Sequence, residues 1–267
     1  MGVSDADGAI RLTSPASSDL RELIAGVMEG RQPPVEEERI ADPELGPPVR
    51  PGKVVAIGLN YRDHADESHV QAPERPLVFS KFPSSVIGPG DAIVVDRALT
   101  ERVDWEVELG VVIGRRMRNV AAEDALGHVL GFTVGNDVSA RDVQFGDVQW
   151  TRGKSFDTFC PLGPCIVTLD EVGDGRDLRL TTTLNGEVMQ DDSTRSMIFD
   201  VPAILAFCSR SFTLEPGDVV LTGTPSGCGE FMEPQRFLTP GDVVEVSVEG
   251  IGSMSNPIVA ADGADAS

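Results

Sequence analysis

Two glutamates separated by a single residue, Glu106 and Glu108, point most directly to chemistry in this sequence. Side chains alternate between the two faces of a β-strand, so a strand here places both carboxylates on one face, roughly 6.5–7 Å apart. The run 109–113 that follows is apolar, as in a strand buried on both faces. Two buried carboxylates repel each other and lose hydration, and a hard divalent cation such as Mg²⁺ or Mn²⁺ offsets that cost. The alternative is an edge strand whose glutamates face water.

A third carboxylate follows a second predicted strand. The apolar run Val129–Val134 leads into Gly-Asn-Asp137, and side chains at strand ends often belong to functional sites. Three carboxylates provide enough ligands for one octahedral ion that keeps open positions for a substrate. A helix N-cap or an Asx turn is the alternative role for Asp137.

A histidine and a glutamate three residues apart, His64 and Glu67, form a candidate acid–base pair. A short helix over this segment would place both side chains on one face. Glu67 could then orient the imidazole of His64 and raise its basicity. The alternative is an exposed helical turn on which the pair has no role.

A series of motifs from about Lys53 to Val259 carries a family resemblance. The sequence resembles the fumarylacetoacetate hydrolase family, in its bacterial branch of acylpyruvate hydrolases and 2-hydroxyhepta-2,4-diene-1,7-dioate isomerases. The motifs are Gly58–Glu67, Phe79–Ser84, Asp104–Leu109, Asn136–Gln144, Arg152–Pro164, Leu214–Asp218, Thr222–Gly227 and Gly250–Pro257. The resemblance implies a mixed β-roll catalytic domain and assembly as a homodimer. Together with the strand-rich sequence and the short leader before it, this predicts a β-rich α+β fold with a small N-terminal domain. It also implies Mg²⁺ or Mn²⁺, with Ca²⁺ as a further candidate, held by Glu106, Glu108 and Asp137.

The resemblance also implies roles for individual residues. Lys154, one of only three lysines in the chain, matches the active-site lysine of the family and would add positive charge near the enolate or carboxylate that forms. The His64–Glu67 pair matches one that activates water, on a lid that orders when substrate binds. The candidates for substrate binding are Arg62, Lys81, Arg141, Gln144 and Thr224. For Arg141 the alternative is a salt bridge to Asp142 or Asp147.

These features predict a divalent-metal-dependent hydrolase of aromatic catabolism that cleaves the C–C bond of acylpyruvate-type 2,4-dioxo acids through a metal-bound enolate. Two alternatives use the same metal site: isomerisation of 2-hydroxyhepta-2,4-diene-1,7-dioate and decarboxylation of oxaloacetate. The carboxylates alone do not separate these reactions, because all three pass through a metal-bound enolate. A ligand-binding protein without activity is a further alternative, which the intact metal and acid–base residues oppose. The expected partner is a small 2-oxo or 2-enol acid.

The elements that must position these residues are mostly strands. Short runs rich in Val and Ile recur between Gly, Pro and Asp, and Asn185-Gly186 between two of them is a hairpin signal. One clear helix is predicted at about 197–209, which is too little helix for repeated βαβ units. Residues 1–50 are predicted to be a small N-terminal segment and linker, 51–259 the catalytic domain and 260–267 a flexible tail.

Composition limits the partners. With 22 Lys and Arg against 43 Asp and Glu, the chain has a formal net charge of -21, which argues against a basic surface for nucleic acid. The sequence has no apolar stretch long enough for a transmembrane helix and no signal-peptide pattern, so we expect no membrane partner and a cytoplasmic location. Its four cysteines form no C-x-x-C pair, which favours neither a thiol zinc site nor disulfides.

Overall fold

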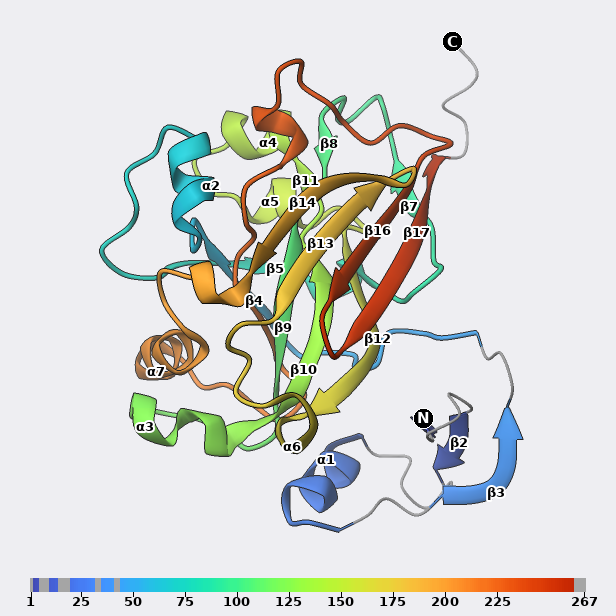
Figure 1. Cartoon of the computed structure of the whole chain (residues 1–267), viewed down its shortest axis with the longest axis vertical. Helices are drawn as coiled ribbons and strands as arrows, with labels where there is room; N and C mark the ends of the chain where they lie inside the picture. The colour runs from blue at the N-terminus through green and yellow to red at the C-terminus, as the bar shows by residue number, and fades with distance from the viewer. Residues whose placement is uncertain (1, 5–9, 14–19, 32–34, 41–43, 262–267) are drawn as a thin grey trace.

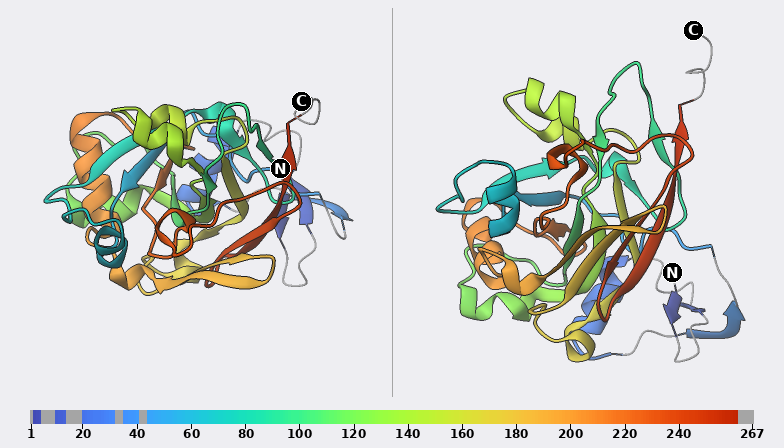
Figure 2. Two further views of the ribbon diagram at one scale, coloured as in Figure 1. Left: turned by 90° about the horizontal axis from the view of Figure 1, so that it is seen from above. Right: turned by 45° about the horizontal axis from the view of Figure 1, so that its top comes forward.

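A curled sheet of seven strands forms the centre of the computed structural model, which describes residues 2–4, 10–13, 20–31, 35–40 and 44–261. In spatial order its strands are β5 (Leu77–Lys81), β4 (Val54–Gly58), β15 (Val219–Leu221), β9 (Val107–Ile113), β10 (Val129–Asn136), β12 (Cys160–Thr168) and β6 (Val86–Ile87). The edge strands β5 and β6 are consecutive in the chain, and only the short 3₁₀ helix η2 (Pro83–Ser85) separates them. The sheet therefore curls until its two edges approach each other (Figure 2).

The central strands bring several strand ends to one end of the sheet. Every residue of β9 and β10 is buried, as their apolar runs predict. β9 is antiparallel to both β10 and β15, and β15 is parallel to β4. The start of β9 therefore lies beside the carboxyl ends of the other three strands, and the loops that leave this end can share one site.

A second sheet of five strands packs against the curled sheet (Figure 1). Its spatial order is β14 (Glu187–Ser193), β13 (Arg179–Leu184), β16 (Val243–Val248), β17 (Gly252–Ala260) and β7 (Ile93–Val95). The predicted Asn185-Gly186 hairpin joins β13 to β14, and its two residues have φ values of 54° and 84°. Leu180 of β13 and Val246 of β16 share an apolar core with Phe132 of β10. The predicted β-rich α+β class and β-roll are confirmed.

The helices are short and peripheral (Figure 1). α7 (Val201–Ser211) begins about four residues later than predicted, because the Asp200 carboxylate caps it by accepting a hydrogen bond from the Ala203 amide at 3.0 Å. Met197 instead forms an isolated bridge with Tyr61, after the 3₁₀ helix η4 (Thr194–Ser196). The other helical elements are α1 (Leu20–Met28), α2 (Arg62–Glu67), α3 (Ala122–Ala125), η3 (Leu126–His128), α4 (Arg141–Gly146), α5 (Thr151–Lys154), α6 (Leu169–Val172) and η5 (Gly229–Phe231).

The N-terminal elements form a small sheet and a helix outside the roll. The sheet contains β1 (Gly2–Ser4), β2 (Ile10–Thr13) and β3 (Val35–Ile40). Elsewhere in the chain, β8 (Val103–Asp104) and β11 (Ser139–Ala140) form a separate two-stranded sheet. α1 packs on the curled sheet, where Ile24 is buried beside Val54 and Val219. Of the predicted tail at 260–267, residues from 262 onward lie outside the described part of the chain. Within the described ranges, every helix is too short or too polar to cross a membrane.

Candidate active site and metal centre

The three predicted metal-binding carboxylates converge where β9 begins and β10 ends. Glu106 directly precedes β9, Glu108 is the second residue of β9, and Asp137 directly follows β10. Because the two strands pair Val107 with Asn136, their adjacent ends bring these side chains together. One oxygen from each carboxylate lies within 4.8 Å of the other two, and each residue is at most 5 % exposed. β9 is a central strand, so the glutamates do not face water as in the edge-strand alternative.

Two of the three lysines reach this carboxylate cluster. The Lys154 ammonium lies 2.8 Å from a carboxylate oxygen of Glu106 and 2.8 Å from one of Asp137. Lys81 contacts the other oxygen of Asp137 at 2.5 Å. Lys81 ends the edge strand β5, and it reaches the end of β10 because the sheet curls. Both lysines are 2 % exposed, so neither has the surface position that is the default for a lysine.

Electrostatics at the cluster compensate Glu106 and leave Glu108 uncompensated. Burial raises the pKa of Glu108 well above its usual range, and the charges of Asp137 and Glu106 raise it further. Burial alone would also raise the pKa of Glu106, but the charges of Lys154 and Arg141 lower it to about 2. A divalent cation would offset the repulsion among the three carboxylates, and an all-oxygen set of buried carboxylates suits a hard ion. The residues present therefore fit the cation that the sequence predicts.

Arg141, the first residue of α4, connects the cluster to a carboxylate that the sequence analysis left without a role. Its guanidinium lies 2.8 Å from Asp104 and 2.7 Å from Glu106, not at Asp142 or Asp147. Asp104 is fully buried and also accepts hydrogen bonds from the amides of residues 229 and 230, at 2.8 and 3.1 Å. The period-two spacing of Asp104, Glu106 and Glu108 was the signal that could have identified it.

The predicted acid–base pair lies on α2 and faces the cluster. His64 Nδ1 is 3.3 Å from a carboxylate oxygen of Glu67, and His64 is 6 % exposed. Glu67 in turn accepts a hydrogen bond from the Gly227 amide at 3.0 Å, which ties α2 to the loop after β15. The ring of Phe231 packs edge-on against the imidazole, with 5.7 Å between the ring centroids. These contacts bury His64 and leave Glu67 only partly exposed, so the pair does not lie on a fully exposed helical turn.

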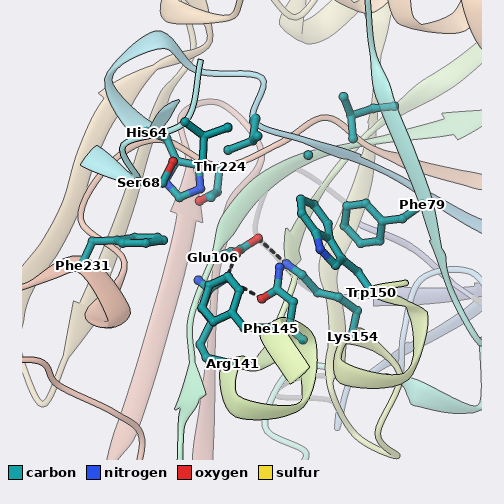
Figure 3. Close-up of a pocket in the computed structure, with 15 residues that line it drawn as sticks. His64, Ser68, Phe79, Glu106, Arg141, Phe145, Trp150, Lys154, Thr224 and Phe231 are labelled. Carbon is teal, nitrogen blue, oxygen red and sulfur yellow. Dashed lines mark hydrogen bonds and ion pairs between the residues drawn. The ribbon is translucent and has the colours of Figure 1, made fainter. Parts of the chain in front are cut away.

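A pocket of about 190 Å³ lies between α2, α4, α5 and the curled sheet (Figure 3). The predicted residues on its wall are His64, Glu106, Arg141, Gln144, Lys154 and Thr224. Neither Lys81, which contacts Asp137, nor Arg62, which is exposed on α2, lines the pocket. The sequence analysis missed the aromatic part of the wall, which Phe79, Phe145, Trp150 and Phe231 form. Their spacing along the chain shows no pattern, so only the fold identifies them.

Thr224 is held by a second residue that the sequence analysis missed. The amide nitrogen of Gln190, on β14, donates to the Thr224 hydroxyl at 2.8 Å, and its amide oxygen accepts from the Val107 amide at 3.0 Å. Gln190 is 1 % exposed. It therefore joins the second sheet to the start of β9 and to the pocket loop.

Comparisons with known proteins agree with this geometry. The model of the family described as "Fumarylacetoacetate (FAA) hydrolase C-terminal" matches residues 53–259. The mitochondrial oxaloacetate tautomerase FAHD2A of Bos taurus is 49% identical over 217 residues, which are 80% of this chain and 69% of that protein. A fumarylacetoacetate hydrolase from Exiguobacterium antarcticum superimposes with a TM-score of 0.87 at 41% identity, over 97% of this chain and 95% of that one. A 2-hydroxyhepta-2,4-diene-1,7-dioate isomerase from Mycobacterium marinum gives 0.78 at 37% identity, over 98% of both chains.

Proposed function

The chain belongs to the fumarylacetoacetate hydrolase family, and on that premise we propose that it is a divalent-metal-dependent enzyme that interconverts the enol and keto forms of a small 2-oxo dicarboxylic acid such as oxaloacetate. The observation that carries the proposal is the cluster of three buried carboxylates beside a pocket that also presents an imidazole. Glu106, Glu108 and Asp137 would hold Mg²⁺, Mn²⁺ or Ca²⁺. The tautomerase name of relatives that are 48–49% identical supports the choice of reaction.

The chain's own residues can move the proton that this reaction requires. Enolisation removes a proton from carbon 3 and leaves negative charge on the oxygen of carbon 2. We assign the proton transfer to His64 on the pocket wall, and the adjacent Glu67 carboxylate stabilises the imidazolium that forms. The Lys154 ammonium stabilises the enolate charge. A bound cation would add Lewis-acid stabilisation of the same charge.

Two neutral side chains are oriented to donate hydrogen bonds to the substrate. Arg141 donates to the amide oxygen of Gln144 at 3.0 Å, which leaves the Gln144 amide nitrogen for a ligand. The Thr224 hydroxyl accepts from Gln190, so its own hydrogen is available toward the pocket that it lines. We propose that both groups, together with Arg141, hold the substrate carboxylate.

The size of the pocket favours a small substrate. A volume of about 190 Å³ is below the roughly 300–1,000 Å³ typical of pockets for drug-sized ligands. A four-carbon dicarboxylic acid fits this space better than a seven-carbon diene dioate does.

Hydrolysis of acylpyruvates is the second candidate. The paired His64 and Glu67 could activate a water for attack on the acyl carbon, with cleavage to pyruvate and a carboxylic acid. The 41% identity to a fumarylacetoacetate hydrolase over nearly the whole chain supports it. Assembly as a homodimer, the cytoplasmic location and the domain limits at 50 and 259 stay predictions from the sequence.

A substrate panel tests the proposal. The purified protein with Mg²⁺ or Mn²⁺ is mixed with enol-oxaloacetate, acetylpyruvate, fumarylpyruvate or a hydroxy-diene dioate, and NMR identifies the products. The control is each metal without protein, because divalent cations accelerate enolisation by themselves. We expect enol-oxaloacetate to convert to the keto form faster than in the metal control, and His64→Ala to remove the acceleration. Turnover of acetylpyruvate alone would replace the proposal with the second candidate.

A further inference from the structure

A cysteine that the proposed reaction does not use lies directly beside the acid–base histidine. The sulfur of Cys228 is 3.9 Å from His64 Nδ1, and Cys228 is fully buried in the loop after β15. One donor atom from each of His64, Glu106 and Cys228 lies within 4.8 Å of the other two. Nitrogen, oxygen and sulfur donors from three separate segments thus converge at one point.

The donor types of this cluster differ from those of the carboxylate cluster. Thiolate and imidazole together favour Zn²⁺ and other thiophilic cations, whereas the carboxylates alone favour hard ions. In a tetrahedral zinc site the Zn–S and Zn–N bonds of about 2.3 and 2.0–2.1 Å place sulfur and nitrogen about 3.6 Å apart. The observed 3.9 Å requires the two side chains to approach by only a few tenths of an ångström.

We propose that His64, Cys228 and Glu106 form a second metal site, which binds Zn²⁺ or a similar thiophilic cation and stops turnover when it is occupied. On binding, the Cys228 thiol releases its proton to solvent and its sulfur becomes a ligand. One oxygen of Glu106 exchanges the Lys154 ammonium for the cation, and Lys154 keeps its contact with Asp137.

Occupancy would stop the reaction for two reasons. A cation on His64 Nδ1 would displace the Glu67 contact and leave the proton of the neutral ring on Nε2, so the imidazole could no longer accept a proton there, a consequence that rests on the proposed function. The cation also shares Glu106 with the carboxylate cluster, so the two sites compete for one ligand. The guanidinium of Arg141, 2.7 Å from Glu106, limits the negative charge left around the occupied site.

Cobalt spectroscopy tests the site without any substrate. Co²⁺ is added in excess to the metal-free protein, and the near-ultraviolet sulfur-to-cobalt charge-transfer band is recorded, because only a thiolate ligand produces it and cobalt at the carboxylate cluster does not. We expect the band in the wild type and in Cys165→Ser, a control at the one half-buried cysteine, and its loss in Cys228→Ser. Cys228→Ala replaces the serine variant if circular dichroism shows that the latter is unfolded. A wild type without the band, or a Cys228 variant that keeps it, overturns the proposal.

Zinc inhibition provides the functional measurement. At saturating Mg²⁺, half-inhibition of Cys228→Ser should require at least about tenfold more Zn²⁺ than that of the wild type, since even partners outside the ligand shell change metal affinity by about 10–100-fold. Turnover without zinc should be unchanged, because Cys228 does not line the pocket. Equal zinc sensitivity in both proteins would place the inhibition at the carboxylate cluster and reject the second site. A chain that shows the cobalt band but no tautomerase activity would reject the proposed function and keep the site.

Discussion

Replacing Lys154 by methionine tests whether the buried carboxylates hold a cation. The Lys154 ammonium contacts Glu106 and Asp137 at 2.8 Å each, and all three residues are at most 5 % exposed. Removing one partner of a buried ion pair costs about 3–5 kcal/mol, because the remaining charge loses its compensation in a low dielectric. Lys81, which contacts Asp137 but neither glutamate, is the ammonium that remains. In a chelator we therefore expect Lys154→Met to lose about 3–5 kcal/mol of unfolding free energy.

Magnesium should reverse much of this loss. The two charges of Mg²⁺ more than replace the missing ammonium, and Lys154 no longer competes with the ion for Glu106 and Asp137. The variant should bind Mg²⁺ more tightly than the wild type does, and bound ligand stabilises the native state by RT ln(1 + [L]/Kd). Its kcat should nevertheless fall by about 10²–10³-fold, as when one donor to a developing oxyanion is removed.

The assay compares urea unfolding of three proteins in EDTA and in saturating Mg²⁺, together with calorimetric titration of Mg²⁺. The matched control is Lys53→Met, which removes the third lysine; its ammonium is 2.5 Å from Asp218 at a side chain 41% exposed. We expect the control to lose no more than about 1 kcal/mol, equally in both buffers. Equal destabilisation of Lys154→Met in EDTA and in Mg²⁺, or weaker Mg²⁺ binding, would refute the assignment of the cation to these carboxylates.

Three further predictions concern the supporting residues. Asp104→Asn removes one of the two carboxylates that contact Arg141 and should lose about 3–5 kcal/mol in urea unfolding along with kcat/KM. Asp142→Asn, which lacks an arginine partner, should lose about 1 kcal/mol, and equal losses would contradict the role of Asp104. Glu67→Gln keeps an acceptor for the Gly227 amide but removes the charge beside His64, so kcat should fall by about 10²-fold without loss of stability. An unchanged kcat would exclude the pair from proton transfer. Burial raises the pKa of Cys160 and of Cys208 to about 12, so iodoacetamide should label Cys165 before either of these thiols. Mass spectrometry identifies the labelled residue, and early labelling of Cys160 or Cys208 would contradict their burial.

Patterns within a few residues were enough to predict the local parts of this site. The strand at Val107–Ile113 and the placement of the glutamates follow from the two-residue period of a strand. The segment Arg62–Glu67 forms the short helix that the spacing of His64 and Glu67 requires. Such features depend on the regular geometry of strands and helices and on the order of polar and apolar residues, and both are accessible from the sequence.

Only the tertiary structure decided which distant groups meet. Lys81 reaches Asp137 because the sheet curls until an edge strand approaches β10, and nothing near position 81 encodes that curvature. Arg141 pairs with Asp104 instead of the nearer Asp142, since a neighbour on the same short helix can point away from it. Cys228 lies beside the imidazole of His64 although 164 positions separate them, because the loop after β15 returns over α2. The sequence by itself determined the chemical groups and their local spacing, whereas the folding of the sheet and the return of its loops determined their partners.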